Sequence, residues 1–340
     1  MASIIDFFRS DEFSAIELMT GINREPFLPT LAGEVVFQAV SVPTTDVAMQ
    51  VEKGKFCILD VRPRGAPPPE NNLVQPEYLT ARTRMINDSF TIQSEQIQNI
   101  TNAPYSTQRE TLAGLVARYQ AQVRRNLVAT FRQSYLSVLT TGKWVNNGNT
   151  IIDWFSFWGQ SQASEIDFAL TTATTDVLGK CEQVRSQMVL ASDGLVPEDA
   201  QIHALMGANF SAALRSHAMV RDTYMGFEDA RMYREQQTFN SFNYGGITWQ
   251  NFRNTTDNST IALAADKVFF YPVGTDVFKT FYAPHDSFST VNTPGIPLNV
   301  VQLMDPPPPN GRNQWVKYEY YTYPLISCLQ PAVLQRGKKA

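Results

Sequence analysis

The stretch TQRETLAGLVARYQAQVRRNLVATFRQSYLSVLTTG, residues 107–142, decides the fold. Thr107 and Glu110 have the spacing of a capping box, in which the hydroxyl accepts from the N3 amide and the carboxylate reaches back. Apolar residues then recur every three or four positions, with one longer step, until Gly142 provides a stop signal. The pattern predicts one helix over residues 107–141, roughly 50 Å long, that crosses a domain as a beam.

A row of arginines follows a second face of this helix. Arg118, Arg125 and Arg132 are seven residues apart, which places them on one line away from the apolar stripe. Such a line offers contacts to nucleic-acid phosphates, but it is more commonly the pattern of a solvated or salt-bridged helix face. The sequence leaves both interpretations open.

The residues after the helix predict a mixed α and β unit. Asn147-Gly148 lies between β-prone runs in residues 143–154, which is a strong signal for a hairpin. From about residue 164 we expect a helix from Thr175, with Val177, Cys181, Val184 and Met188 facing inward, and a second helix capped by Asn209. Strands are predicted at 201–206, 247–252 and 267–271. Because 340 residues exceed the usual size of one domain, two packed units are expected.

The residues before the helix predict extended segments around a proline-rich excursion. Residues 34–42 and 47–51 have strand patterns, and a turn at 53–55 followed by β-prone 56–61 predicts a hairpin. Residues 62–76 contain too many prolines for a helix or a sheet interior, so they must project or link. A strand over residues 78–86 then returns, with Arg82 and Arg84 on one face.

The first 46 residues contain too little apolar sequence to close a compact unit. Phe7, Phe8 and Phe13 suit at most one short helix, and Pro26 and Pro29 then favour an extended backbone. We therefore expect this segment to lie on another surface.

Composition limits the class of protein. The chain is 43% hydrophobic and 11% aromatic, as in folded proteins, and its net charge of −4 argues against a protein that mainly coats nucleic acid. No apolar stretch has the length of a signal peptide or a membrane span, so a soluble protein made inside the cell is expected. Cys57, Cys181 and Cys328 are far apart and are predicted to be buried thiols.

Catalytic and metal-binding patterns are absent from the sequence. It lacks the common nucleotide-loop, zinc-protease and hydrolase motifs, and none of its three histidines has a second ligand at metal-binding spacing. The consecutive residues His285, Asp286 and Ser287 cannot converge as a triad. The pairs Glu165 with Asp167, and Glu228 with Asp229, are predicted to be solvated surface. We expect that the protein is not an enzyme and that it binds no metal and no cofactor.

Several separated segments carry a family resemblance. In the C-terminal part these are FYPVG at 270–274, FKTFYAP at 278–284 and TVNTPGIP at 290–297. Further segments are DEFS at 11–14, LMTGIN at 18–23, PFLP at 26–29, VPTTDVA at 42–48, RPRG at 62–65, DFAL at 167–170, TTDV at 174–177, YPL at 323–325 and QP at 330–331. Together they resemble the lambda-like major capsid proteins, the phage capsid E family. DPPPPNG at 305–311 and the aromatic run at 318–323 depart from that pattern.

The resemblance implies an α+β fold of the HK97 type. Its order of parts would be 1–43 for the N-terminal arm and first strand, 44–90 for the E-loop, 91–163 for the P-domain with spine helix 107–141, 164–275 for the A-domain, and 276–340 for a return segment with the Pro-rich loop 305–311. Isopeptide cross-linking, which some relatives of the fold perform, cannot be matched to residues of this sequence.

The resemblance also implies a function by assembly. The protein would form pentamers and hexamers of an icosahedral phage head around double-stranded DNA, assembled in the host cytoplasm and found in the virion. Its partners would be itself, scaffolding, decoration and portal proteins, and packaged DNA without sequence preference, with no membrane. The expected assembly contacts are Phe7, Phe8, Phe13, Arg62, Arg64, Pro67, Pro68, Pro69, Arg82 and Arg84. For Arg82 and Arg84, plain surface charge is an equal alternative. An encapsulin-like compartment and a stand-alone enzyme are the competing classes.

Overall fold

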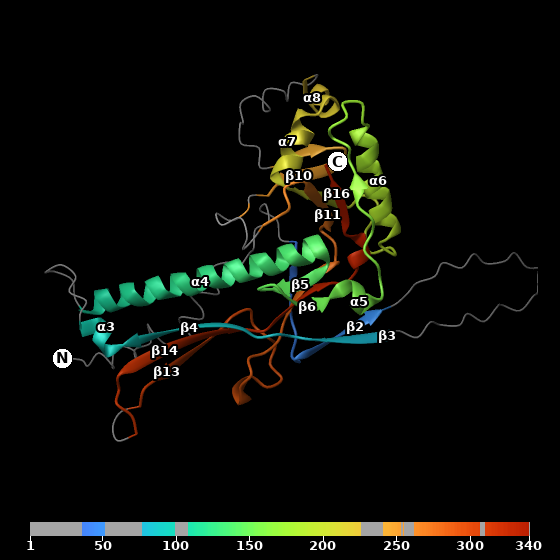
Figure 1. The fold of residues 1–340 in the computed structure, drawn as a ribbon. Helices are drawn as coiled ribbons and strands as arrows, with labels where there is room; N and C mark the ends of the chain where they lie inside the picture. Colours follow the sequence, from blue (N-terminus) through green and yellow to red (C-terminus); the bar gives the residue numbers. More distant parts are fainter. Residues whose placement is uncertain are drawn as a thin grey trace, which may run out of the picture.

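The computed structural model describes residues 36–51, 77–98, 108–225, 241–252, 254, 262–306 and 310–339. Figure 1 shows a long helix, α4, lying along a narrow sheet, with a second sheet and its helices rising at one end. A two-stranded ribbon points away from the body at that same end. The molecule is therefore an elongated plate with a domain standing on it.

Helix α4 runs from Gln108 to Thr141, 34 residues, and confirms the predicted beam. Its apolar stripe is buried as expected: Val116, Val123, Leu127, Phe131 and Val138 are each at most 4% exposed. The chain leaves the helix at a glycine with φ +65°, position 142, whose amide donates to the carbonyl of residue 138 at 2.9 Å. Thr107 lies outside the described residues, so the capping box stays a prediction.

The narrow sheet lies under α4 and has the order β13-β14-β4, all antiparallel. Its strands are β4 (Ile86–Gln93), β13 (Asn299–Met304) and β14 (Trp315–Thr322), and the short α3 (Ser94–Gln98) follows β4. Tyr318 and Tyr320 are fully buried in one cluster with Val123 and Leu127 of α4. The aromatic run that departs from the family pattern thus alternates between the core of the plate and its outer face.

The standing domain is built on a six-stranded sheet of order β7-β16-β11-β8-β10-β9. The strands are β7 (Ile166–Asp167), β8 (Gln201–Met206), β9 (Ser241–Tyr244), β10 (Ile247–Asn251), β11 (Lys267–Val273) and β16 (Gln335–Lys338). The helices beside it are α6 (Val177–Leu190), α7 (Ala208–Ser216) and α8 (Ala218–Met225). The inward residues predicted for α6 are fully buried: Val177, Cys181, Val184 and Met188.

Smaller elements join the plate to the standing domain. A three-stranded sheet of order β1-β12-β15 is formed by β1 (Gln38–Ser41), β12 (Phe278–Tyr282) and β15 (Pro324–Cys328). The hairpin β5 (Lys143–Asn146) and β6 (Asn149–Asp153) confirms the Asn147-Gly148 signal, with φ of 48° and 79° at the two turn residues. Helix α5 (Trp154–Trp158) and the 3-10 turns η2 (Phe288–Thr290) and η3 (Pro331–Val333) complete the set.

The predicted strand over residues 78–86 is wrong as a single element. It divides into β3 (Glu77–Arg82) and β4, because both the amide and the hydroxyl of Thr83 bond to the Thr45 carbonyl, at 3.0 and 2.9 Å. The amide of Arg84 donates to the Pro324 carbonyl at 3.1 Å, so this joint is held by two different neighbours. The strand β2 (Asp46–Val51) pairs with β3, whereas its predicted partner at 56–61 lies outside the described residues.

One predicted helix start and one predicted hairpin end also need correction. Asn209 does not cap α7, since the N-cap is Gly207 and the Asn209 side chain donates to Asp266 at 3.1 Å. Trp154 opens α5 and does not extend the hairpin, because the Asp153 side chain caps that helix by accepting from two of its amides.

The described thiols behave as expected. Cys181 and Cys328 are free and fully buried, and burial raises the pKa of Cys181 to about 12. Cys57 lies outside the described residues.

Candidate assembly surfaces

The ribbon β2–β3 lies at the end of the plate below the standing domain (Figure 1). Its strands pair antiparallel from Asp46 opposite Arg82 to Val51 opposite Glu77. Near its base Val47, Met49 and Ala81 are buried in the main core, while Tyr78 is 61% exposed. Within the described residues no third strand joins it. Because a two-stranded ribbon is marginally stable in water by itself, its outer part needs another surface.

The structure places Arg82 and Arg84 on either side of the joint between β3 and β4. The Arg82 side chain is 71% exposed, and its Nε lies 4.0 Å from Asp46 Oδ1 across the ribbon. An exposed pair of this kind contributes little to stability, so Arg82 stays available to another molecule. Arg84 is exposed beside it. The other predicted contacts lie outside the described residues and remain predictions: Phe7, Phe8, Phe13, Arg62, Arg64, Pro67, Pro68 and Pro69.

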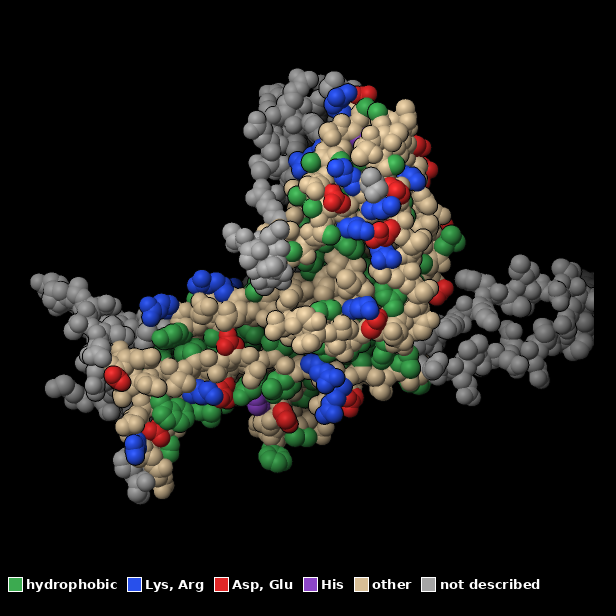
Figure 2. All heavy atoms as spheres, viewed as in Figure 1, with side chains coloured by type: hydrophobic (Ala, Val, Ile, Leu, Met, Phe, Trp, Pro, Cys, Tyr) green, Lys and Arg blue, Asp and Glu red, His purple; other side chains and the backbone are tan. Residues whose placement is uncertain are grey.

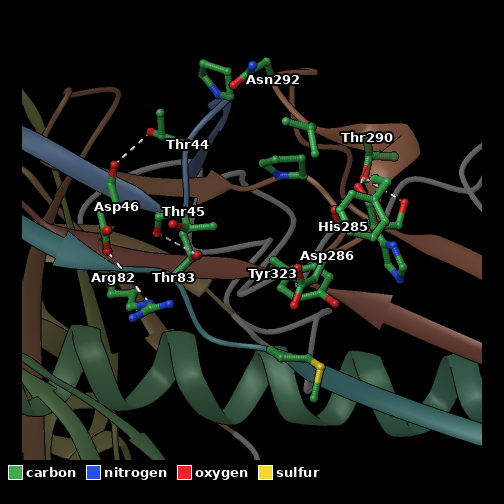
Figure 3. Close-up of a pocket in the computed structure, with 16 residues that line it drawn as sticks. Thr44, Thr45, Asp46, Arg82, Thr83, His285, Asp286, Thr290, Asn292 and Tyr323 are labelled. Atoms are coloured by element: carbon green, nitrogen blue, oxygen red, sulfur yellow. Dashed lines mark hydrogen bonds and ion pairs between the residues drawn. The ribbon is translucent and has the colours of Figure 1, made fainter.

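A cavity of about 850 Å³ opens where the ribbon joins the plate. One wall comes from Pro43 to Asp46 and Arg82, Thr83 and Met85, and the other from the segment 284–292 with Tyr323 (Figure 3). The lining is mostly neutral hydroxyl, amide and ring groups. The cavity can therefore receive a short polypeptide segment more readily than a highly charged small molecule.

One wall of this cavity ends in an exposed aromatic side chain that the sequence patterns did not single out. Phe288 is fully exposed, and Val291 and Met85 beside the same cavity are 59% and 53% exposed. The Thr290 hydroxyl holds this turn by donating to the His285 carbonyl at 2.5 Å. An apolar residue inside the Ser- and Thr-rich run at 286–290 was the available signal. An exposed aromatic side chain is the kind that anchors protein interfaces.

The consecutive residues His285, Asp286 and Ser287 all line this cavity. The Ser287 hydroxyl bonds to the hydroxyls of Ser289 and Thr290, at 2.7 and 3.2 Å, and His285 packs edge-on against Tyr321 with ring centres 5.0 Å apart. In the described geometry the Ser287 hydroxyl and the His285 ring therefore have partners other than each other. No group of three or more His, Cys, Asp or Glu side chains that could hold a metal occurs among the described residues.

The two other described histidines have structural partners. His203 is buried with its Nδ1 2.9 Å from the Gln250 side-chain nitrogen, and His217 Nε2 lies 3.1 Å from the Thr172 carbonyl. In the described part of the chain, no helix is both long and apolar enough to cross a membrane.

The carboxylates Glu165 and Asp167 are engaged in ion pairs, and not only solvated as predicted. Glu165 Oε2 lies 2.5 Å from Lys267 Nζ, and Asp167 Oδ2 lies 3.2 Å from Lys338 Nζ. The hydrogen bond from Lys267 lowers the pKa of Glu165, and a hydrogen bond from the backbone amide of Ala169 lowers the pKa of Asp167. Both groups are thus kept ionised, which suits a structural role more than proton transfer. Glu228 and Asp229 lie outside the described residues.

Comparison with known proteins decides the family. The sequence profile of the family described as Phage major capsid protein E matches residues 14–339. The chain belongs to the phage major capsid protein E family. It is 27% identical over 252 residues to the major capsid protein of Pseudomonas phage KPP10, covering 68% of this chain and 70% of that protein.

Solved structures of capsid proteins share the fold of this family member. The putative capsid protein of a prophage of E. coli CFT073 superposes with a TM-score of 0.51 at 16% identity, over 78% of this chain and 80% of that one. The protein in the mature capsid of bacteriophage PhiM1 superposes with a TM-score of 0.50 at 13% identity, over 89% of this chain and 85% of that one. The predicted α+β fold of the HK97 type is thereby confirmed. Membership of capsid E also favours a phage-head subunit over the encapsulin-like alternative.

Proposed function

We propose that this chain is the repeating subunit of an icosahedral phage head, in which pentamers and hexamers enclose double-stranded DNA. The function is physical: buried area between copies closes the shell, and the protein is not an enzyme. It is a component of the virion and assembles in the host cytoplasm. The family match over residues 14–339 is the observation that carries this proposal.

The shape of the subunit supports assembly through surfaces that reach beyond its own core. The ribbon β2–β3 and the exposed Phe288 both surround the cavity at the joint, and neither is fully covered by the described chain. We assign the ribbon, with the loop 52–76, to the E-loop that grips a neighbouring copy, and Phe288 to a contact between copies. The arm with Phe7, Phe8 and Phe13, and the loop with Arg62, Arg64, Pro67, Pro68 and Pro69, belong to the same proposal.

The remaining parts follow the family order. The plate of α4 with β4, β13 and β14 corresponds to the P-domain, and the six-stranded sheet with its helices to the A-domain. The loop at 305–311 connects β13 to β14 and projects from the P-domain. Scaffolding, decoration and portal proteins are the further partners expected of such a subunit.

The register of the ribbon allows a sharp test. Val51 lies opposite Glu77, so residues 52–76 can be replaced by a two-residue Asn-Gly turn that closes β2 directly onto β3. This closed-ribbon variant should remain a folded, soluble subunit and should form no shells, as measured by sedimentation and electron microscopy. A second variant with Pro67, Pro68 and Pro69 replaced by serine keeps the loop length and should assemble more weakly, because its loop is less pre-extended. Shells of normal size and yield from the closed-ribbon variant would refute the proposed grip.

A further inference from the structure

The two broad faces of the plate differ in charge. The outward face of α4 carries Arg118, Arg125 and Arg132, all exposed, and the helix has no Asp or Glu after position 110. Figure 2 shows separate basic patches on this upper side of α4, whose only basic residues are arginines. In the part of the chain that the structure describes, no acidic side chain forms an ion pair with any of the three. We call these residues the arginine stripe.

The opposite face, formed by the sheet, has no such excess of positive charge. The outward residues of β14 include Lys317 and Glu319, whose Nζ and Oε1 are 2.5 Å apart and neutralise each other. The outward positions of β4, which alternate with its inward ones, are the uncharged Asn87, Ser89, Thr91 and Gln93. On β13, Leu303 faces outward and is 41% exposed. This face is neutral and partly apolar.

The geometry of the arginine stripe suits a nucleic-acid backbone. Arg118 and Arg132 are 14 residues apart, so the stripe runs for roughly 21 Å along the axis with a cation about every 10 Å. Apart from Arg125, the exposed residues between them are the uncharged Ala121, Gln122, Asn126 and Ala129, so no acidic side chain of the helix opposes a rod-like polyanion there. Duplex DNA presents a phosphate on each strand about every 3.4 Å, so the stripe meets phosphates along roughly six base pairs without reading bases.

We infer that the outward face of α4 faces the interior of the shell and binds the phosphate backbone of the packaged duplex through Arg118, Arg125 and Arg132. This inference rests on the proposed function, because only a closed shell gives the plate an inner and an outer face. A protein of net charge −4 repels DNA over most of its surface, so a cationic stripe free of acidic partners concentrates binding on one side. The neutral sheet face is then directed outward.

The orientation is tested on assembled shells with a bulky maleimide reagent that does not enter closed particles. Arg125→Cys places a thiol on the helix face, and Ser89→Cys is the matched exposed position on the sheet face. In closed shells the Ser89→Cys thiol should react and the Arg125→Cys thiol should not, and both should react in dissociated subunits. The reverse labelling pattern would overturn the inference. Absence of shells from the unsubstituted protein would instead refute the proposed function.

The phosphate contact is tested by fluorescence anisotropy of unassembled subunits with a random-sequence duplex over a range of salt. Replacing all three arginines of the stripe by glutamine should reduce the slope of log affinity against log salt by about 2.7, since each neutralised phosphate contributes about 0.9. The control Lys180→Gln, Arg221→Gln and Lys339→Gln removes the same charge from the standing domain and should leave the slope unchanged. An equal reduction of the salt slope in both variants would overturn the proposed site. So would polyglutamate that displaces the labelled duplex as well as unlabelled DNA does.

Discussion

The end of the long helix offers a test of how this fold is held together. Gly142 has φ +65°, and a Cβ added there would lie 2.4 Å from Cε2 of Phe155. In the variant Gly142→Ala the left-handed backbone should cost about 1–2 kcal/mol. Overpacking against the buried ring should add about 1–3 kcal/mol. We therefore expect the free energy of unfolding to fall by about 2–5 kcal/mol in total.

A matched glycine separates the two effects. Gly148 has φ +79° in the β5–β6 turn, and an added Cβ would meet nothing within 4 Å, so Gly148→Ala should show the backbone cost alone. Urea unfolding of the closed-ribbon subunit, followed by tryptophan fluorescence, compares the variants without the contribution of assembly. Adding Phe155→Leu should recover part of the loss in Gly142→Ala and none in Gly148→Ala. Equal losses in the two glycine variants would refute the packing argument.

Three further outcomes follow from described contacts. The folded-state pKa of Glu165 lies below its ordinary value of 4.5, so the ionised carboxylate stabilises the fold above pH 4.5, and this stabilisation is lost as pH falls through the folded pKa. Glu165→Gln should therefore lose less stability than the parent protein on acidification. Acid-unfolding curves that coincide for the two proteins would contradict this. Phe288→Ser should change folding stability by less than about 0.5 kcal/mol, because the ring is exposed, yet weaken shell formation measured by light scattering. The pKa of Tyr321 is raised to about 12, mainly by the hydrogen bond between its hydroxyl and Glu319. Glu319→Gln should therefore lower this pKa toward the ordinary value of 10.0, as measured by ultraviolet titration.

Elements with a strong local pattern could be predicted from the sequence. The stripe of α4, the Asn147-Gly148 turn and the inward face of α6 all appear where expected, because helix periodicity and left-handed turn residues depend on nearby residues alone. The division of residues 78–86 could not be foreseen. It depends on bonds to Thr45 and Pro324, which are far away in the chain.

The candidate assembly surfaces show the same limit. Arg82 and Arg84 could be singled out as exposed cations near a projecting ribbon, and the structure does leave them exposed. Phe288 was missed because an aromatic residue in sequence is normally assigned to a core. Contacts distant in sequence, such as those of His285 with Tyr321 and Tyr323, place this segment so that the ring stays outside.

By itself, the sequence determined the long helix, the mixed α and β composition and the resemblance to a capsid family, since periodicity and short motifs are local properties. Tertiary structure alone decided that β4, β13 and β14 form one sheet under α4, because strands far apart in sequence pair only when the chain closes. That pairing creates the plate with its two unlike faces. The sequence offered the arginines at 118, 125 and 132 as candidate phosphate contacts, and the structure added that they are exposed and that the opposite face is neutral.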